Sequence, residues 1–431
     1  MFANVFLILC AYYFIKPLRE GWIAISGIPS LSKMEVKAYS SFGQSLLLIF
    51  IIRAYARTTD HYTRSDLITR ATIFCMSNLV VFWCLQPDFF IGHLPGIGII
   101  FYLWVGMFGL FVVAQFWAFA ADLYSDEEGR RLIPMVAIGA TAGAASGSWI
   151  TETLVNSGLF GSEFLLLISL VPLSASIYLT QLTDRRGPVG KGNVAPDRPK
   201  TVARERHGAF EIVSSNRFLL AVAGITLFMN WVNTNGENLL FGVVQEFLAR
   251  DATAKGVTDP GALLEFVRDG TAAFYGNFFL WVNLAALFLQ AIVASRLLKY
   301  GGFGVILLML PVVALMSYST MALLPILGIV KVMKIAENST DYSINNTARS
   351  VLWLPVTTEM TYKGKPTIDT LFARMGDGLA ALTVLFGVQI FALATSSFFA
   401  FNVALTIIWL IVSLVVIREH RLLAQSPQPA P

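Results

Sequence analysis

Charged side chains lie inside stretches of this sequence that are otherwise apolar. The first group is Lys16, Arg19 and Glu20, within AYYFIKPLREGW at residues 11–22. A charge at such a place in a membrane usually faces a polar cavity, pairs with a partner or binds a ligand. On a helix, Lys16 shares a face with both of its charged neighbours. We interpret Lys16 and Arg19 as candidate substrate contacts; the alternative is a pair at the membrane surface whose side chains reach the headgroups.

A carboxylate surrounded by amides follows in FMNWVNTNGENLLF at residues 228–241. Asn233 and other asparagines stand close to Glu237, and Gly236 can loosen the helix. A carboxylate in this setting can bind a proton, a cation or a basic group of a substrate. We take Asn233 and Glu237 as candidate substrate contacts; the alternative is an external helix end capped by polar residues.

A polar stripe crosses the apolar stretch 323–347. Lys334, Glu337, Asp341 and Asn345 follow the spacing i, i+3, i+7 and i+11, so they share one face of a helix. Both signs of charge on one membrane helix predict a wet surface or one that faces other helices. Lys334 is a candidate substrate contact, and Glu337 and Asp341 are candidates for coupling or gating. The alternative is an ion-pair ladder that only holds helices together.

A second pair of opposite charges stands in the stretch 366–392. Arg374 and Asp377 are one turn apart and lie roughly 12 and 17 Å along the predicted helix, near the middle of a bilayer. We expect them to neutralise each other, with Arg374 as a substrate contact and Asp377 in coupling or gating. The alternative is a buried ion pair without a ligand.

Two further segments bear on how the site is built. In QFWAFAADLYS at residues 115–125, Gln115, Trp117 and Asp122 are spaced to line one wall of a cavity, which adds Trp117 to the candidate substrate contacts. The segment GATAGAASG at residues 139–147 contains only small residues. Such residues let helices approach closely, so we expect this segment to pack against another helix.

Composition sets the class of protein. Of 431 residues, 56% are hydrophobic and 13% are charged, and the mean hydropathy is +0.66. Soluble domains carry about 25% charged residues, so the chain is predicted to be an all-α polytopic membrane protein. The sequence has no Walker A, GxSxG or HExxH motif, and its four His are scattered. We expect no enzyme activity, cofactor or metal, and transport, if any, must be secondary active or facilitated.

The apolar stretches predict twelve transmembrane helices in two six-helix bundles. Residues 1–182 would form the N-terminal bundle, 183–216 a polar cytoplasmic linker, 217–420 the C-terminal bundle and 421–431 a cytoplasmic tail. This arrangement resembles the major-facilitator-type transporters, in which two bundles rock around a central site. The predicted spans are 3–25, 38–58, 69–89, 96–122, 131–156, 160–181, 217–240, 272–297, 302–321, 323–347, 366–392 and 394–417.

The distribution of basic residues predicts the orientation. Most of the 31 Lys and Arg fall in loops on the side of the 183–216 segment. By the positive-inside rule both termini are cytoplasmic, and we expect a multi-pass protein of the cell inner membrane. Between the seventh and eighth spans, residues 250–270 should form an external loop. The expected partners are lipid and a small-molecule substrate, with no nucleic acid, and a monomer is the simplest expectation.

Residues 341–377 resemble the bacterial and plastid ATP/ADP translocase family. The matching residues, in order, are Tyr342-Ser343, Leu354-Pro355, Glu359, Lys363-Gly364-Lys365, Ile368-Asp369, Arg374 and Gly376. Weaker similarity covers 12–20, 116–147 and 233–237. The resemblance implies a nucleotide transporter that handles phosphates with intramembrane Lys and Glu. Here Asp341 and Asp377 stand where the family shows Lys, which favours a less charged anion or a nucleotide-like molecule over ATP and ADP.

The favoured function is therefore secondary transport of a nucleotide, a nucleotide-like molecule or another organic anion, by exchange or proton coupling. The acidic Asp341 and Asp377 leave open a proton-coupled exporter of a cationic or amphipathic compound, with Glu237 and Asp377 as proton carriers. A third alternative is a non-transporting membrane scaffold or receptor on a translocase fold. Counterflow of a labelled substrate would exclude this last possibility.

Overall fold

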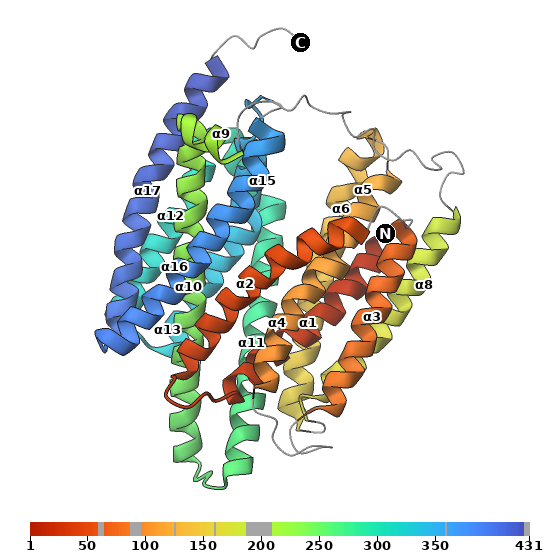
Figure 1. The fold of residues 1–431 in the computed structure, drawn as a ribbon, viewed down its shortest axis with the longest axis vertical. Coiled ribbons are helices and arrows are strands. Elements are labelled where there is room, and N and C mark those ends of the chain that lie inside the picture. The colour runs from red at the N-terminus through yellow and green to blue at the C-terminus, as the bar shows by residue number, and fades with distance from the viewer. Residues whose placement is uncertain are drawn as a thin grey trace.

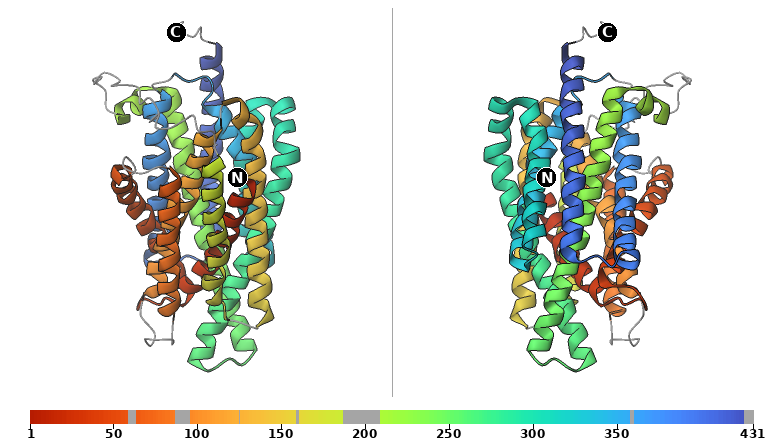
Figure 2. Two further views of the ribbon diagram at one scale, coloured as in Figure 1. Left: turned by 90° about the vertical axis from the view of Figure 1, so that its right-hand side faces the viewer. Right: turned by 90° about the vertical axis from the view of Figure 1, so that its left-hand side faces the viewer.

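Helices make up nearly all of the computed structural model, which describes residues 1–58, 64–86, 96–124, 126–158, 161–186, 209–357 and 360–425 (Figure 1). Most of the long helices run along the long axis of the molecule in the front view and in both side views (Figure 2). We call residues 1–186 the N-terminal half and residues 209–425 the C-terminal half.

The helices of the N-terminal half lie on the right in Figure 1, apart from α2, which crosses towards the other half. Labels with η denote π-helical turns. The elements are α1 (Phe2–Ile25), α2 (Lys33–Thr58), α3 (Arg64–Cys84), α4 (Ile97–Phe108), η2 (Gly109–Val113), α5 (Ala114–Leu123), α6 (Asp126–Ser157), α7 (Phe164–Ile168) and α8 (Leu170–Arg186).

The C-terminal half contains most of the π-helical turns. Its elements are α9 (Ala209–Ser215), α10 (Arg217–Ala254), α11 (Pro260–Phe288), η3 (Leu289–Ala294), α12 (Ser295–Leu323), α13 (Leu327–Thr340), η4 (Asp341–Asn345), α14 (Asn346–Leu352), η5 (Met360–Gly364), α15 (Lys365–Thr367), η6 (Ile368–Phe372), α16 (Ala373–Leu385), η7 (Phe386–Ile390) and α17 (Thr395–Gln425).

The described residues contain eight helical stretches that are long and apolar enough to cross a membrane. One of them, Pro260–Leu323, has 64 residues. A straight helix of that length would measure about 96 Å, three times the thickness of a hydrocarbon core of about 30 Å. It is not straight, because Gly302 has a φ of 70° that breaks the helical path. This break coincides with the start of the predicted span 302–321.

Three predicted non-membrane segments are more helical than expected. The predicted linker 183–216 contains the last turn of α8 and the whole of α9, and α17 passes residue 420 into the predicted tail. The predicted external loop 250–270 is mostly a hairpin of two helices, α10 and α11, which protrudes at the end opposite to the C-terminus (Figures 1 and 2). Asp259 caps α11 by accepting a hydrogen bond from the Ala262 amide, and Pro260 occupies the first turn.

The buried apolar side chains form two clusters. One lies within the N-terminal half, among α1 and α3 to α8. The other is centred on α10 to α17 and includes a few residues of α1, α2, α4 and α6. The two halves meet where α1, α2 and α6 pack against α10, α11 and α16. This seam is where most of the charged residues singled out by the sequence come together.

Candidate functional site

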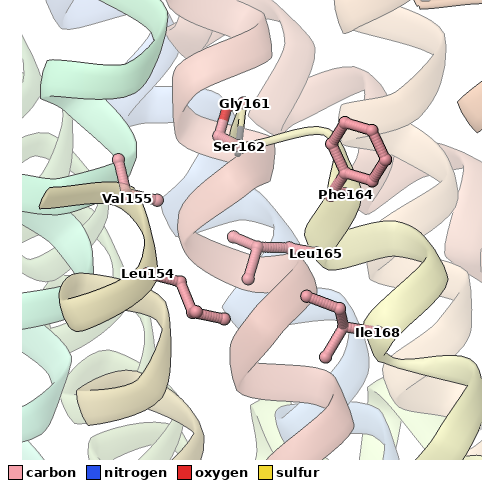
Figure 3. A pocket seen from close by; sticks show the side chains of 7 residues that line it. All are labelled: Leu154, Val155, Gly161, Ser162, Phe164, Leu165 and Ile168. Carbon is pink, nitrogen blue, oxygen red and sulfur yellow. The ribbon is translucent and has the colours of Figure 1, made fainter. Parts of the chain in front are cut away.

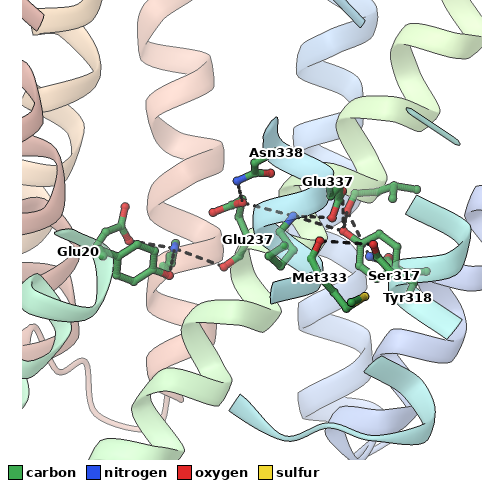
Figure 4. A network of polar contacts seen from close by, with 12 residues as sticks. Glu20, Glu237, Ser317, Tyr318, Met333, Glu337 and Asn338 are labelled. Carbon is green, nitrogen blue, oxygen red and sulfur yellow. Dashed lines mark hydrogen bonds and ion pairs between the residues drawn. The ribbon is translucent and has the colours of Figure 1, made fainter. Parts of the chain in front are cut away.

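We call seven charged residues at the seam between the halves the central charge cluster, and Figure 4 shows the polar network that contains its members Glu20, Glu237 and Glu337. Four come from α1 and α2 of the N-terminal half and three from α10 and α13 of the C-terminal half. Its members are Lys16, Arg19, Glu20, Lys37, Glu237, Lys334 and Glu337.

The N-terminal side of the cluster is centred on Glu20. This carboxylate is only 1% exposed, accepts hydrogen bonds from the Arg19 guanidinium and lies 2.9 Å from the Lys37 ammonium. Lys37 is itself 2% exposed. The sequence prediction began the second span at residue 38 and so left Lys37 outside the membrane. In the structure α2 begins at Lys33, so Lys37 is a buried helical residue that faces α1.

The C-terminal side is centred on Lys334, which is fully buried. Its ammonium lies 2.9 Å from Glu337 and 3.3 Å from Glu237. Glu337 also accepts a hydrogen bond of 2.9 Å from the Tyr318 hydroxyl, and Asn338 donates one of 2.9 Å to Glu237. Glu237 remains 26% exposed, so part of its carboxylate stays accessible.

Lys37 connects the two sides through neutral groups. Its ammonium donates to the backbone carbonyl of Glu237 and to the Tyr275 hydroxyl, each at 3.4 Å. It also lies 4.7 Å from the centre of the Phe241 ring. All three groups belong to α10 and α11. A cation of the N-terminal half is thus inserted into the C-terminal half, with no ion pair to it among the residues that the structure describes.

Lys16 takes a different position from the one expected. Instead of pairing with Glu20, its ammonium lies over aromatic rings, 3.9 Å from the centre of Phe279 and 5.1 Å from that of Tyr13. Arg19 likewise stacks 4.4 Å from the centre of Tyr102. Cation–π contacts are worth about 0.5–2 kcal/mol. They hold a cation without neutralising it, and no ion pair of Lys16 is found within the described part of the chain.

The charges of the cluster do not cancel. Four cations face three carboxylates, which leaves a net charge of +1. We assign the excess positive charge to Lys16. Among the four cations of the cluster, it is the one whose ammonium contacts aromatic rings and no carboxylate within the described residues. A low-dielectric environment strengthens the attraction between opposite charges, so an anion in contact with Lys16 would be attracted strongly.

Arg374 and Asp377 form the expected pair, with 2.9 Å between guanidinium and carboxylate. Asp377 also accepts hydrogen bonds of 2.7 Å from Ser45 and 2.8 Å from Thr234, and Arg374 donates to Ser45 at 2.8 Å. Ser45 belongs to α2 of the N-terminal half. The pair therefore forms a second polar contact across the seam, and no hydrogen bond or ion pair among the described residues joins it to the central charge cluster.

The remaining candidates are not brought into the cluster. Asp341 accepts a hydrogen bond of 2.7 Å from Asn345, the next residue of the polar stripe predicted along 334–345, and both belong to the π-helical turn η4. Trp117 lies in the N-terminal apolar cluster, edge-on to Phe116. Asn233 is half-buried on α10 and makes no hydrogen bond to the cluster within the described residues. Glu359, named in the translocase resemblance, falls outside the described residues.

Several residues of the site carried no usable sequence signal. Tyr275 and Tyr318 lie in apolar helices, where the sequence predicts that a Tyr is an ordinary core residue. Ser45 is an ordinary small residue of α2. Lys37 was detectable, because a span moved four residues towards the N-terminus would have enclosed it together with Glu35.

Two pockets in the described part of the chain lie away from the central charge cluster. A cavity lined by Leu154, Val155 and Leu165 among others has a volume of about 10 Å³, enough for one water molecule (Figure 3). A groove of about 510 Å³ runs between the end of α6 and the start of α11. Neither touches the central charge cluster. In the described part of the chain no group of three or more His, Cys, Asp or Glu is placed to hold a metal ion.

Solved structures with the same fold were found over almost the whole chain. A bacterial homologue of the human lysosomal transporter Spinster is 16% identical with a TM-score of 0.55, covering 99% of this chain and 98% of its own. A variant of the nucleoside transporter NupG is 13% identical with a TM-score of 0.59, covering 96% and 99%. The human organic anion transporter MFSD10 is 13% identical with a TM-score of 0.57, covering 96% and 97%.

These neighbours are major-facilitator-type transporters, and a peptide-transporter-family (POT) structure in complex with 5-aminolevulinic acid belongs with them, at a TM-score of 0.62 and 12% identity over 98% of this chain and 96% of its own. No protein-family model and no curated protein matches the sequence. At such low identity the likeness establishes the fold. The chain is therefore a multi-pass membrane protein with the fold of the major-facilitator-type transporters.

Proposed function

We propose that this protein is a secondary transporter that moves a small organic anion, such as a nucleotide-like molecule, across the cell inner membrane by exchange or proton coupling. The observation that carries the proposal is the net charge of +1 of the central charge cluster, with Lys16 held by rings instead of a carboxylate. The fold supports it, since structural neighbours are described as transporters of nucleosides and of organic anions.

The proposed topology has twelve crossings. They are α1, α2, α3, α4–α5, α6, α7–α8, α10, α11–η3, α12, α13–α14, η5–η7 and α17. The bundles would comprise residues 1–182 and 217–420. The linker 183–216, the tail 421–431 and the N-terminus would be cytoplasmic, as the distribution of Lys and Arg indicates.

We assign direct substrate contact to Lys16, Arg19 and Glu237, because these three are only partly buried and lie at the seam. Lys334 is fully buried and held by two carboxylates, so it acts by positioning Glu237. Arg374 is similarly occupied by Asp377. Trp117 and Asn233 remain candidates for the walls of the substrate path.

The resemblance to ATP/ADP translocases bears on the charge of the substrate. Where that family shows Lys, Asp377 is present and accepts hydrogen bonds from three side chains. This position supplies no free cation for a phosphate. With one excess positive charge in the central charge cluster, an anion of low charge fits better than ATP or ADP.

The test uses purified protein in proteoliposomes with labelled adenosine monophosphate, succinate and benzoate in separate arms. We expect uptake of at least one anion, and counterflow when the same unlabelled anion is inside. Lys16→Gln should lower the uptake about tenfold or more, because a charge-assisted hydrogen bond contributes about 1.5–3 kcal/mol. The matched control is Lys255→Gln, whose side chain is 58% exposed and pairs with Asp251 in the hairpin.

A cation exporter is the second candidate, and the 26% exposure of the Glu237 carboxylate is the observation in its favour. The same proteoliposomes, loaded with a lipophilic cation such as tetraphenylphosphonium, distinguish the two. Proton-driven cation movement that is lost in Glu237→Gln, with no flux of the three anions, would replace our proposal. No flux of any compound would favour a scaffold or receptor.

A further inference from the structure

We propose that Glu20 is a built-in counter-anion that takes the place of the substrate's negative group when the site is empty. As a result the empty protein can change conformation, and the protein carries out net transport and not obligate exchange. This inference rests on the proposed function and decides between two modes that the proposed function leaves open.

The first observation is the position of Glu20 between two cations. It accepts a hydrogen bond from Arg19 and lies 2.9 Å from the Lys37 ammonium, and Figure 4 shows where Glu20 lies relative to Glu237. In the described part of the chain no other carboxylate lies within ion-pair distance of either cation. The other partners of Lys37 are the Tyr275 hydroxyl, the Glu237 carbonyl and ring faces, all of them neutral.

The second observation is how the ion pairs divide between the halves. Arg19, Glu20 and Lys37 all belong to α1 and α2, so their pairs lie wholly within the N-terminal half. The pairs of Lys334 with Glu237 and Glu337 lie wholly within the C-terminal half. One half can therefore move against the other without breaking any ion pair of the central charge cluster.

Only weaker contacts of the cluster cross the seam. They are the two 3.4 Å hydrogen bonds of Lys37 to neutral groups, its cation–π contacts with Phe241 and Tyr275, and the cation–π contact between Lys16 and Phe279. Removing one partner of a buried ion pair is strongly unfavourable, because it leaves an uncompensated charge. In the empty protein Glu20 prevents this for Arg19 and Lys37. Without Glu20, a substrate anion would have to be present each time the halves move.

The experiment compares two fluxes of the same labelled anion, the one of adenosine monophosphate, succinate and benzoate that the wild type transports fastest. Net efflux is measured into buffer without the anion, and exchange is measured into buffer containing it. Wild type should show both. Glu20→Gln should lose net efflux about tenfold or more and keep exchange within about threefold of wild type. Glu265→Gln, at a carboxylate 66% exposed in the hairpin, is the matched control and should change neither flux.

A second variant protects the test against misfolding of Glu20→Gln. In Glu20→Gln/Lys37→Met one charge of each sign is removed, which restores the net charge of the wild-type cluster. This double variant should recover net efflux. Folding of every variant is checked by its elution as a single species in detergent before reconstitution.

The outcomes separate this inference from the proposed function. Exchange without net efflux in the wild type would overturn the inference alone, and so would full net efflux in folded Glu20→Gln. Failure of the folded double variant to regain net efflux would also overturn it. If the wild type moves none of the three anions in either assay, the proposed function fails, and the inference fails with it.

Discussion

Asp377 is a residue at which three hydrogen bonds meet, one of them across the seam. It accepts hydrogen bonds from Ser45 of α2, Thr234 of α10 and Arg374 of α16, and its side chain is 10% exposed. A carboxylate with three donors is well satisfied as an anion. Its part in the molecule is therefore to connect α2 with α10 and α16.

Removing Arg374 should weaken this connection. Arg374→Ala leaves Asp377 with two neutral donors, and we expect a loss of about 1–3 kcal/mol in stability, because a buried acceptor is left partly unsatisfied. The guanidinium is 33% exposed, which keeps the loss below that of a fully buried pair. The measurement is the midpoint of thermal unfolding in detergent. The double variant Arg374→Ala/Asp377→Ala should recover part of the loss.

A matched control is available in the same half of the molecule. Arg349 and Asp369 are also 2.9 Å apart, but their side chains are 42% and 35% exposed. Arg349→Ala should shift the midpoint little, since exposed pairs contribute about 0–1 kcal/mol. Equal midpoints for both single variants and the wild type would mean that the Asp377 pair faces water.

At the scale of single residues, the sequence predicted ion pairs within a helix and missed side-chain contacts between helices. The spacing of Arg374 and Asp377 indicated their ion pair, and the structure shows it. Ser45, 332 positions away from Asp377, had no such signal. The prediction that Lys16 meets Glu20 was wrong, because Lys37 of a different helix occupies that carboxylate.

The contact between α1 and α6 depends on the small residues of 139–147. Gly139, Gly143 and Gly147 are spaced by four and face Phe2, Phe6 and Cys10 of α1. A Cβ at Gly143 would overlap the backbone carbonyl of Phe6, and backbone cannot move aside as a side chain can. The predicted close packing of this segment is confirmed, with α1 as its partner.

Gly143→Ala should therefore damage the N-terminal half. We expect it to cost about 3 kcal/mol, at the upper end of the range for overpacking, and to lower the yield of folded protein. The measurement is again thermal unfolding in detergent. Gly328→Ala, at a helical glycine with nothing within 4 Å of the added Cβ, is the control and should be neutral or slightly stabilising. A neutral Gly143→Ala would show that α1 and α6 are not in close backbone contact.

The polar stripe of 334–345 shows why helical spacing alone was insufficient. A regular α-helix would place Asp341 below Glu337 on one face. Asp341 is the first residue of the π-helical turn η4 and bonds with Asn345, the next member of the stripe, and within the described residues no hydrogen bond or ion pair joins it to the cluster. Local composition does not distinguish such a turn from ordinary helix.

For the whole molecule, the orientation in the membrane follows from charge. A reporter fused within 196–206 or after Pro431 should behave as cytoplasmic, and one inserted at Thr258 as external, because most Lys and Arg lie on the linker side. Paired reporters, one active only outside and one only inside, give opposite readings at each site. An external signal from the linker fusion would contradict the two-bundle topology.

The sequence was sufficient to predict the overall architecture. It was not sufficient to predict which helices of the two halves face each other. Apolar length and the break at 183–216 predicted a helical membrane protein in two parts, and the structural neighbours confirm the fold class. The seam depends on side chains that meet across more than a hundred residues, such as Lys37 with Tyr275. Nothing in the periodicity of one helix specifies which other helix it faces.

The hairpin of α10 and α11 has a practical consequence. The 38 residues of α10 span about 57 Å, so nearly half of its length extends beyond a hydrocarbon core of about 30 Å. The turn at its tip is well defined, with Gly256 at a φ of 70° and the Val257 amide bonded to the Ala252 carbonyl. A feature that protrudes in this way can help to orient a 47.4 kDa protein in an electron micrograph. A rigid domain grafted at this tip, or an antibody raised against it, would serve as a fiducial marker for image alignment.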